Sequence, residues 1–257
     1  KNNKLYWFVK GLDREAIVEY NSTTSESRFI AVDLSMSDST LEPFLKFSDK
    51  YITGISILDD LLFWTDGVNE PKKINIKESS QENPALNINQ QTHAVLKVDG
   101  EIKGPLKEEH ITVVKKKPSN APTVEVKKLS YSSQEPIFEK IFPRFCFRYK
   151  YKDGEYSAFG PFTDVVFNPV YQGFIDQNTS YMTDEPYNKA MSNTISAICL
   201  YDFVPSDIPS DVVQVDLLYK QENSTTIYSI ANIKYTDDEW SADGSNQFTE
   251  VEGVISR

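Results

Sequence analysis

The chain has few of the residues that most often bind metals or act as nucleophiles. Its 257 residues include two cysteines and two histidines. Cys146 and Cys199 lie far apart in strand-like segments with apolar neighbours, which predicts two buried free thiols rather than a disulfide bridge or metal ligands. His93 and His110 have no cysteine or further histidine beside them. Because a zinc site needs more ligands, we expect surface or strand-end histidines and predict no metal site.

Long apolar runs and catalytic motifs are absent as well. No segment approaches the roughly 18 consecutive apolar residues of a membrane span. The sequence has no Gly-rich phosphate loop, no nucleophile elbow, no H-E-x-x-H motif and no Asp box of sialidase-type propellers. These absences predict no membrane span, no enzyme, no catalytic residues and no cofactor. Since the chain starts at Lys1 and still has a strand-like pattern at residues 250–257, we expect a fragment of a longer chain.

Acidic residues cluster at Asp59-Asp60, at Glu108-Glu109 and at Asp237–Glu239. We interpret these clusters as turns and solvated faces. A calcium site at the last cluster, together with residues 243–246, is the weaker alternative because the EF-hand spacing is not met.

Positive charge is scarce and unevenly placed. The net charge is −11 and the isoelectric point is about 4.8. By segment, the charge is −4 over residues 1–100, +6 over 101–152 and −13 over 153–257. Such a chain lacks the coherent basic surface that binding of phosphates requires. For the basic run Lys115–Lys117, we favour a solvated strand end that leads into a linker over a nucleic-acid site.

Residues 144–162 contain the strongest local signal. From Phe145 to Tyr151, aromatic residues alternate with Cys146 and basic residues, which is typical of a strand with one buried face. Asp153-Gly154 then predicts a type I′ turn. The cross-strand pairs that this turn predicts are Lys152 with Glu155, Tyr151 with Tyr156 and Tyr149 with Ala158.

The return strand of this hairpin contains a second signal. Gly160-Pro161 removes a side chain and then a hydrogen-bond donor. We therefore expect the pairing to stop or bulge there and to resume through Asp164–Phe167.

An internal repeat organises the first part of the chain. Residues 2–8 and 59–65 match as a turn pair, an aliphatic residue, an aromatic residue and a tryptophan, at an offset of 57 that also relates Ile17 to Ile74. Each unit predicts a strand, a polar loop and a return strand, with further strands at Arg28–Asp33 and Tyr51–Leu58. This pattern is typical of a propeller blade, although 57 residues exceeds the roughly 40–50 of common blades.

The segment Phe63–Asp66 is similar to the YWTD signature of receptor-type propellers. We favour the simpler interpretation that the aromatic residues pack and that Asp66 forms a turn through its own side chain.

The sequence predicts an all-β protein with a boundary at Pro118–Pro122. Residues 1–117 form the propeller-like region, and residues 123–257 read as an antiparallel sandwich of fibronectin type III or immunoglobulin kind. The aromatic-rich loop 168–193 is predicted to be a contact surface. The strands expected in the second region are Thr123–Lys128, Pro143–Lys152, Glu155–Phe167, Thr194–Tyr201, Val212–Lys220, Thr226–Lys234 and Gln247–Val251.

The pattern inside two of these strands makes further predictions. Thr194–Tyr201 is apolar on both faces, as a central strand is. In Val212–Lys220 one face is apolar, and the opposite face, with Gln214, Asp216 and Lys220, is expected to be solvated.

Three segments taken together resemble a known family. Residues 62–71 (LFWTDGVNEP), residues 109–114 (EHITVV) with Asn120–Pro122, and residues 147–159 (FRYKYKDGEYSAF) are similar to the tail nozzle proteins of short-tailed phages. The resemblance is closest to the muzzle, or stabilisation, proteins of crAss-like phages, and it runs through most of the chain.

The resemblance implies a virion structural protein of the phage tail. It implies a homo-oligomer, a six-fold ring, that contacts other tail proteins and carries a propeller-like part and a fibronectin-like part. In that family the ring extends the DNA conduit and helps to retain and release the genome, and the resemblance implies that DNA passes through without specific binding. The family's motifs assign no catalytic residues.

The charge pattern fits such a conduit, because an acidic wall repels DNA and lets it slide. The hypothesis is that the acidic residues Asp202, Asp207, Asp211 and Asp216 face the lumen.

Two alternatives remain open from the sequence. One is a secreted or cell-surface adhesion or receptor module with a YWTD-like propeller and a fibronectin type III-like domain. It would make use of the sequons at Asn21, Asn178 and Asn223. The other is a carbohydrate-active propeller enzyme, which would need paired carboxylates in a pocket.

Overall fold

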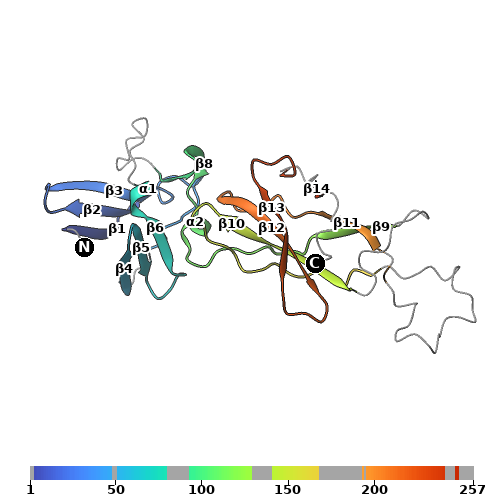
Figure 1. The fold of residues 1–257 in the computed structure, drawn as a ribbon. Helices are drawn as coiled ribbons and strands as arrows, with labels where there is room; N and C mark the ends of the chain where they lie inside the picture. The colour runs from blue at the N-terminus through green and yellow to red at the C-terminus, as the bar shows by residue number, and fades with distance from the viewer. Residues whose placement is uncertain are drawn as a thin grey trace, which may run out of the picture. The chain divides into compact units, whose positions relative to one another are not determined.

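The computed structural model describes residues 3–47, 51–79, 93–128, 141–167, 193, 195–240 and 247–248. The chain divides into two compact units (Figure 1). The first consists of Lys1–Lys116 with Pro209–Asp211, and the second of Lys117–Ile208 with Val212–Arg257. The division after Lys116 lies beside the segment predicted to be the boundary, but the assignment of Pro209–Asp211 to the first unit was not predicted.

The predicted all-β class is confirmed. The sheets are antiparallel, and none of those in the described residues closes on itself. The two helices among these residues have four residues each, and neither is long or apolar enough to span a membrane.

In its described residues the first unit has two three-stranded sheets, with orders β1-β2-β3 and β4-β5-β6, and the hairpin β7-β8. Its elements are β1 (Lys4–Lys10), β2 (Glu15–Asn21), β3 (Glu26–Asp33), β4 (Gly54–Leu58), β5 (Leu61–Thr65), β6 (Lys72–Asn75), α1 (Ile76–Ser79), β7 (Val95–Val98), β8 (Glu101–Pro105) and α2 (Glu108–Ile111). Lys115–Lys117, expected to be a strand end, follows no strand, because residues 108–112 instead form α2 and a single bridge between Lys72 and Thr112.

Both sheets of the first unit contribute to one core. Phe8 of β1 and Trp64 of β5 have ring centroids 5.6 Å apart, and Phe47 lies 5.7 Å from Phe8. The buried apolar residues of this core are Ile17, Ile30, Ala31, Phe44, Leu45, Phe47, Leu62, Trp64, Ile74, Ile76 and Ile111.

The two repeats form the predicted strand pairs, but in different registers. Ile17 pairs with Phe8, whereas the matching Ile74 pairs with Leu62, three positions away from the repeat equivalent of Phe8. Because side chains alternate along a strand, an odd register shift reverses which face a residue occupies. Both isoleucines face the core, so the two tryptophans point to opposite sides.

Turns between strands form largely as their residues predict. Asp66 Oδ1 accepts hydrogen bonds from the backbone N–H groups of Val68 (2.9 Å) and Asn69 (2.8 Å), as expected for a turn built on its side chain. Asp99 and Gly100 both have positive φ and join β7 to β8 through a two-residue turn.

The described part of the second unit has two three-stranded sheets, with orders β10-β12-β13 and β14-β11-β9. Their strands are β9 (Thr123–Lys128), β10 (Pro143–Tyr151), β11 (Ile195–Tyr201), β12 (Val212–Gln221), β13 (Tyr228–Lys234) and β14 (Gln247–Phe248). These bounds agree closely with the predicted strands, and β11 is central in its sheet as its two apolar faces predict. Glu155–Phe167 is the exception, because it forms only a single bridge at Tyr156.

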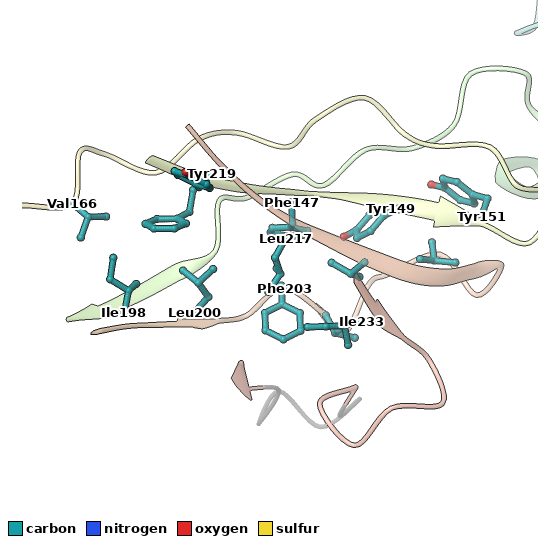
Figure 2. Close-up of a cluster of buried hydrophobic side chains, with 14 of the residues drawn as sticks. Phe147, Tyr149, Tyr151, Val166, Ile198, Leu200, Phe203, Leu217, Tyr219 and Ile233 are labelled. Atoms are coloured by element: carbon teal, nitrogen blue, oxygen red, sulfur yellow. The ribbon is translucent and has the colours of Figure 1, made fainter. Parts of the chain in front are cut away.

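Both sheets of the second unit bury side chains in a shared core. Figure 2 shows Phe147 and Leu217 pointing towards Phe203. The predicted buried face of β10 is confirmed, since Phe145, Phe147, Tyr149 and Tyr151 are at most 2% exposed. Cys146 and Cys199 are buried and free, as predicted. The second unit is therefore built from two antiparallel sheets that share a core. Its fibronectin-like topology stays a prediction.

The predicted register of the β10 hairpin is wrong by one residue. The N–H of Tyr151 donates to the carbonyl of Glu155, and Lys150 rather than Tyr151 bridges to Tyr156. Gly154 has positive φ, but Asp153 does not, so the loop is not a type I′ turn. The slip of one residue moves Tyr156 from the core face of the hairpin to the opposite face.

The return segment of this hairpin follows β10 with an irregular spacing. The backbone N–H groups of Ser157, Gly160, Thr163 and Val166 donate to the carbonyls of Tyr149, Phe147, Phe145 and Pro143. The segment thus advances three residues for every two of β10. The bulging is continuous rather than confined to Gly160-Pro161 as predicted.

Side-chain hydroxyls complete this irregular pairing. The N–H of Tyr149 donates to Ser157 Oγ, and the N–H of Phe145 donates to Thr163 Oγ1, both at 3.0 Å. Each hydroxyl therefore replaces a carbonyl that a regular strand would supply. A side chain at Gly160 would collide with the Phe147 carbonyl, 3.0 Å from the position of its Cβ.

Candidate interaction surfaces

The outer face of β1 is an exposed apolar surface. β1 is an edge strand, and its apolar residues occupy both faces. Tyr6 and Phe8 pack against the core, whereas Leu5, Trp7 and Val9 on the other face are 54%, 51% and 43% exposed. We call these three residues the β1 apolar face.

Residues of β2 continue this face. Leu5 is paired with Tyr20 and Trp7 with Val18, and both partners are half-buried. The rings of Trp7 and Tyr20 stack with centroids 5.9 Å apart. Trp64, the repeat equivalent of Trp7, is only 3% exposed. The same aromatic-Trp pattern therefore places a tryptophan in the core in one sheet and on the surface in the other.

A second surface lies on the face of β10 that points away from the aromatic core. Its cations are Arg148 and Lys150 of β10 and Lys220 of β12, and its aromatic rings are Tyr156, Phe159 and Phe162 of the return segment. We call these six residues the cation–aromatic face.

Each cation of this face lies over an aromatic ring. The guanidinium carbon of Arg148 is 4.1 Å from the Tyr156 ring centroid and 5.7 Å from that of Phe159. Lys150 Nζ is 5.5 Å from the Tyr156 centroid. Lys220 Nζ is 4.8 Å from the Phe162 centroid. These distances allow cation–π attraction, which orients the ammonium groups without neutralising them.

The centre of this sheet face is not solvated as predicted, because Asp216 is buried. Its Oδ2 accepts a hydrogen bond from Arg148 Nε at 3.0 Å, and its Oδ1 accepts one from Gln214 at 2.6 Å. The cross-strand register places Arg148 directly opposite Asp216. The pair neutralises Arg148, whereas Lys150 and Lys220 have no carboxylate opposite them in the β10–β12 register.

The two histidines are internal hydrogen-bonding groups rather than surface residues. His110 Nδ1 accepts from the backbone N–H of Lys107 at 3.0 Å, and its Nε2 lies 3.1 Å from Ser210 Oγ. His93 Nδ1 accepts from the backbone N–H of Leu34 at 3.1 Å. The expectation of a surface or strand-end histidine is therefore wrong for His110, which is buried in α2, whereas His93 is half-buried and lies just before the start of β7.

The acidic clusters do not form a metal site in the described residues, where no three potential ligands gather. Glu108 pairs with Lys46 and, at 2.9 Å, with Lys72. Asp59 takes positive φ in the turn between β4 and β5. Residues 243–246, as well as most of the predicted contact loop 168–193, lie outside the described part of the chain.

Two buried charged side chains form hydrogen bonds with the backbone of the irregular segment 44–47. Sequence reasoning did not identify this role for either side chain. Asp33 Oδ2 accepts from the N–H groups of Phe44 (2.7 Å) and Leu45 (2.9 Å). Lys72 Nζ donates to the carbonyls of the same two residues at 2.9 and 2.7 Å. A lysine at the start of a strand gives no sequence signal that distinguishes this role from a solvated one.

The basic run Lys115–Lys117 is not fully solvated, contrary to the prediction from the sequence. Lys115 is buried and donates to Asp211 Oδ2 at 3.3 Å and to the carbonyl of His110 at 3.2 Å. Lys116 and Lys117 are exposed. One lysine of the run is therefore part of the interior of the first unit, and the solvated-run prediction fails for it.

Comparison with known proteins identifies no matching family model, no similar curated protein and no similar solved structure.

Proposed function

We propose that this chain is a structural, non-enzymatic subunit of a phage tail nozzle or muzzle. The observation that carries the proposal is the β1 apolar face. Three large apolar side chains on an edge strand, each more than 40% exposed, form the kind of surface that a neighbouring protein covers in an assembly. The resemblance of residues 62–71, 109–114 with 120–122, and 147–159 to tail nozzle proteins supplies the identity of that assembly.

The use of ionisable groups supports a structural role. Asp33 and Asp216 are buried and hydrogen-bonded to backbone or side-chain donors, and Asp211 pairs with Lys115. Such groups stabilise irregular loops and strand pairs, since they satisfy polar atoms that burial would otherwise leave without partners. The proposed activity therefore comes from shape and assembly.

Only two of the four aspartates that were expected to face a lumen are exposed. Asp211 and Asp216 are 0% and 3% exposed, so they face the protein interior. Asp202 and Asp207 are exposed, and the proposal that acidic residues repel DNA in a conduit rests on them.

Particle composition tests this function. Phage particles that encode this chain are purified by density gradient, and their proteins are identified and quantified by mass spectrometry. The proposal predicts that the chain co-purifies with capsid and portal proteins at a fixed ratio. Its absence from particles, with recovery in a secreted or cell-surface fraction, would contradict the tail function and favour the adhesion alternative.

A further inference from the structure

The cation–aromatic face is unusual in a chain of net charge −11. Lys150 and Lys220 belong to its sheet face together with the neutralised Arg148. Their ammonium groups lie over the rings of Tyr156 and Phe162, where they keep a full positive charge. This face is therefore a local cationic surface in a chain of net negative charge.

The rings of this face add apolar contact area. Tyr156 and Phe159 are 42% and 41% exposed, although both are large aromatic residues. Aromatic side chains bury much apolar area for few rotatable bonds and are enriched in protein–protein interfaces. Rings beside oriented ammonium groups match a protein surface that offers carboxylates, because the carboxylates pair with lysine while the rings exclude water.

The same charges limit how two copies can meet. A contact that sets this face against the same face of a second copy would place like charges together, which is unfavourable. A favourable contact instead joins the cationic face of one copy to an acidic surface of the next. Asp238 and Glu239 supply such carboxylates, since both are exposed in the turn that follows β13.

We propose that the cation–aromatic face binds the acidic Asp238-Glu239 turn of a second copy of this chain. The choice of a neighbouring subunit as the partner rests on the proposed function. The choice of the two contacting surfaces rests on their opposite charges. Where the two surfaces meet head-to-tail, repetition of the contact generates a closed ring or an open filament. The register of the β10 hairpin contributes to the site, because the bridge between Lys150 and Tyr156 places Tyr156 on this face.

Self-association of the purified full chain tests the proposal. Sedimentation velocity is measured over a concentration series at low and high salt for the wild type and for Lys150→Glu/Lys220→Glu. The wild type is expected to associate more weakly at high salt, and the charge reversal is expected to raise the dissociation constant by about tenfold or more. Lys150→Arg/Lys220→Arg is the matched control and should retain association. Thermal melting of each variant establishes that it is folded.

A second pair of variants tests the direction of the contact. Asp238→Lys/Glu239→Lys should also weaken self-association. When this variant is mixed with Lys150→Glu/Lys220→Glu, the two reversed surfaces become complementary, and a mixed complex is expected to form. A wild-type chain that stays monomeric, unchanged association after lysine reversal, or the absence of a mixed complex would each overturn the proposal.

Nucleic acid is the competing ligand for a cationic surface with exposed rings. Binding of a fluorescent DNA duplex and of a single strand is therefore measured with the same variants. DNA binding that is lost on lysine reversal, with self-association unchanged, would overturn the proposed partner. These measurements use the purified chain, whereas the tail function is tested on particles, so either idea can fail while the other holds.

Discussion

Lys115 and Asp211 form a buried ion pair between positions 96 residues apart, with Lys115 Nζ 3.3 Å from Asp211 Oδ2. Asp211 lies in the segment Pro209–Asp211, which belongs to the first unit, while the chain on both sides of it belongs to the second. The first unit therefore includes a short segment from between β11 and β12.

Breaking this pair should strongly destabilise the protein. Lys115→Met leaves the buried Asp211 carboxylate without its cation, which costs about 3–5 kcal/mol in buried pairs of this kind. Denaturation in guanidinium chloride, followed by tryptophan fluorescence, measures the loss. Lys117→Met, at an exposed position in the same basic run, is the control and should change stability by no more than about 0.5 kcal/mol.

Replacement of both partners separates the cost of an unpaired buried charge from the net contribution of the intact ion pair. Lys115→Met/Asp211→Leu removes both charges, and apolar replacements of a buried pair are often neutral or stabilising. The double variant should therefore recover most of the stability that the single variant loses. Equal stability of the wild type and Lys115→Met would contradict the assignment of the pair.

The hydroxyls of Ser157 and Thr163 should be needed for the β10 hairpin. Thr163→Val keeps the shape of the side chain but removes the acceptor for the N–H of Phe145, and a buried donor without a partner costs about 1–3 kcal/mol. Ser157→Ala should act in the same way on the N–H of Tyr149. The measurement is the thermal melting of each variant.

The control for this prediction keeps the hydroxyl. Thr163→Ser retains the acceptor and should lose clearly less stability than Thr163→Val. If the serine and valine variants melted at the same temperature, the hydroxyl would not be the acceptor that completes the strand pairing.

Much of the second unit could be predicted because its strands alternate in polarity. The bounds of β9 to β13, the central position of β11 and the buried aromatic face of β10 all follow from period-two patterns. The repeat likewise identified the strand pairs of the first unit. Local alternation is a property of the sequence, so these elements needed no knowledge of tertiary contacts.

The register of the β10 hairpin could not be predicted in this way. Asp99-Gly100 and Asp153-Gly154 are the same dipeptide, yet only the first has positive φ at both residues. In the second hairpin, hydrogen bonds from β10 to the hydroxyls of Ser157 and Thr163 fix a different register. Long-range side-chain bonds of this type decide between turns that the dipeptide alone leaves equivalent.

Buried charges escaped prediction for a related reason. Lys72 and Lys115 occur in polar sequence, where solvation is the usual state of a lysine. Their partners are Glu108 and Asp211, which only the tertiary fold brings close to them. The same limit applies to the cation–aromatic face, because its rings come from a segment that lacks regular strand structure.

The stability of the first unit should depend on the ionisation of Glu15. Burial raises the pKa of Glu15 above its ordinary value of 4.5, although the hydrogen bond from Phe47 lowers it in part. The folded state thus holds the proton more tightly than the unfolded state. The stabilisation from protonated Glu15 is complete below the unfolded pKa and is lost as the pH rises through the folded pKa.

The variant Glu15→Gln tests this linkage. It should be more stable than the wild type at neutral pH, with the advantage declining as the pH falls towards 4.5. Urea denaturation over a pH series measures the difference in the free energy of unfolding. Glu70→Gln, at an exposed position, controls for the loss of a carboxylate. An advantage for Glu15→Gln that grows towards acidic pH would reverse the expected sign.

The two cysteines should be inert in the folded protein. Burial raises the pKa of the Cys146 thiol to about 12, and both sulfur atoms are shielded from solvent. A thiol reagent with a coloured product should therefore label neither residue in native buffer and both in guanidinium chloride. Rapid labelling of Cys146 in the native protein would show that this part of the β10–β12 sheet opens.

Protection of Trp7 on assembly tests the central claim, which is that the β1 apolar face contacts a neighbouring protein. Hydroxyl-radical footprinting with mass spectrometry compares the free subunit with the intact particle, and Trp64, 3% exposed, is the internal control. If a neighbouring protein covers this face, Trp7 is oxidised in the free subunit and protected in the particle, while Trp64 is protected in both. Equal oxidation of Trp7 in the two states would contradict it.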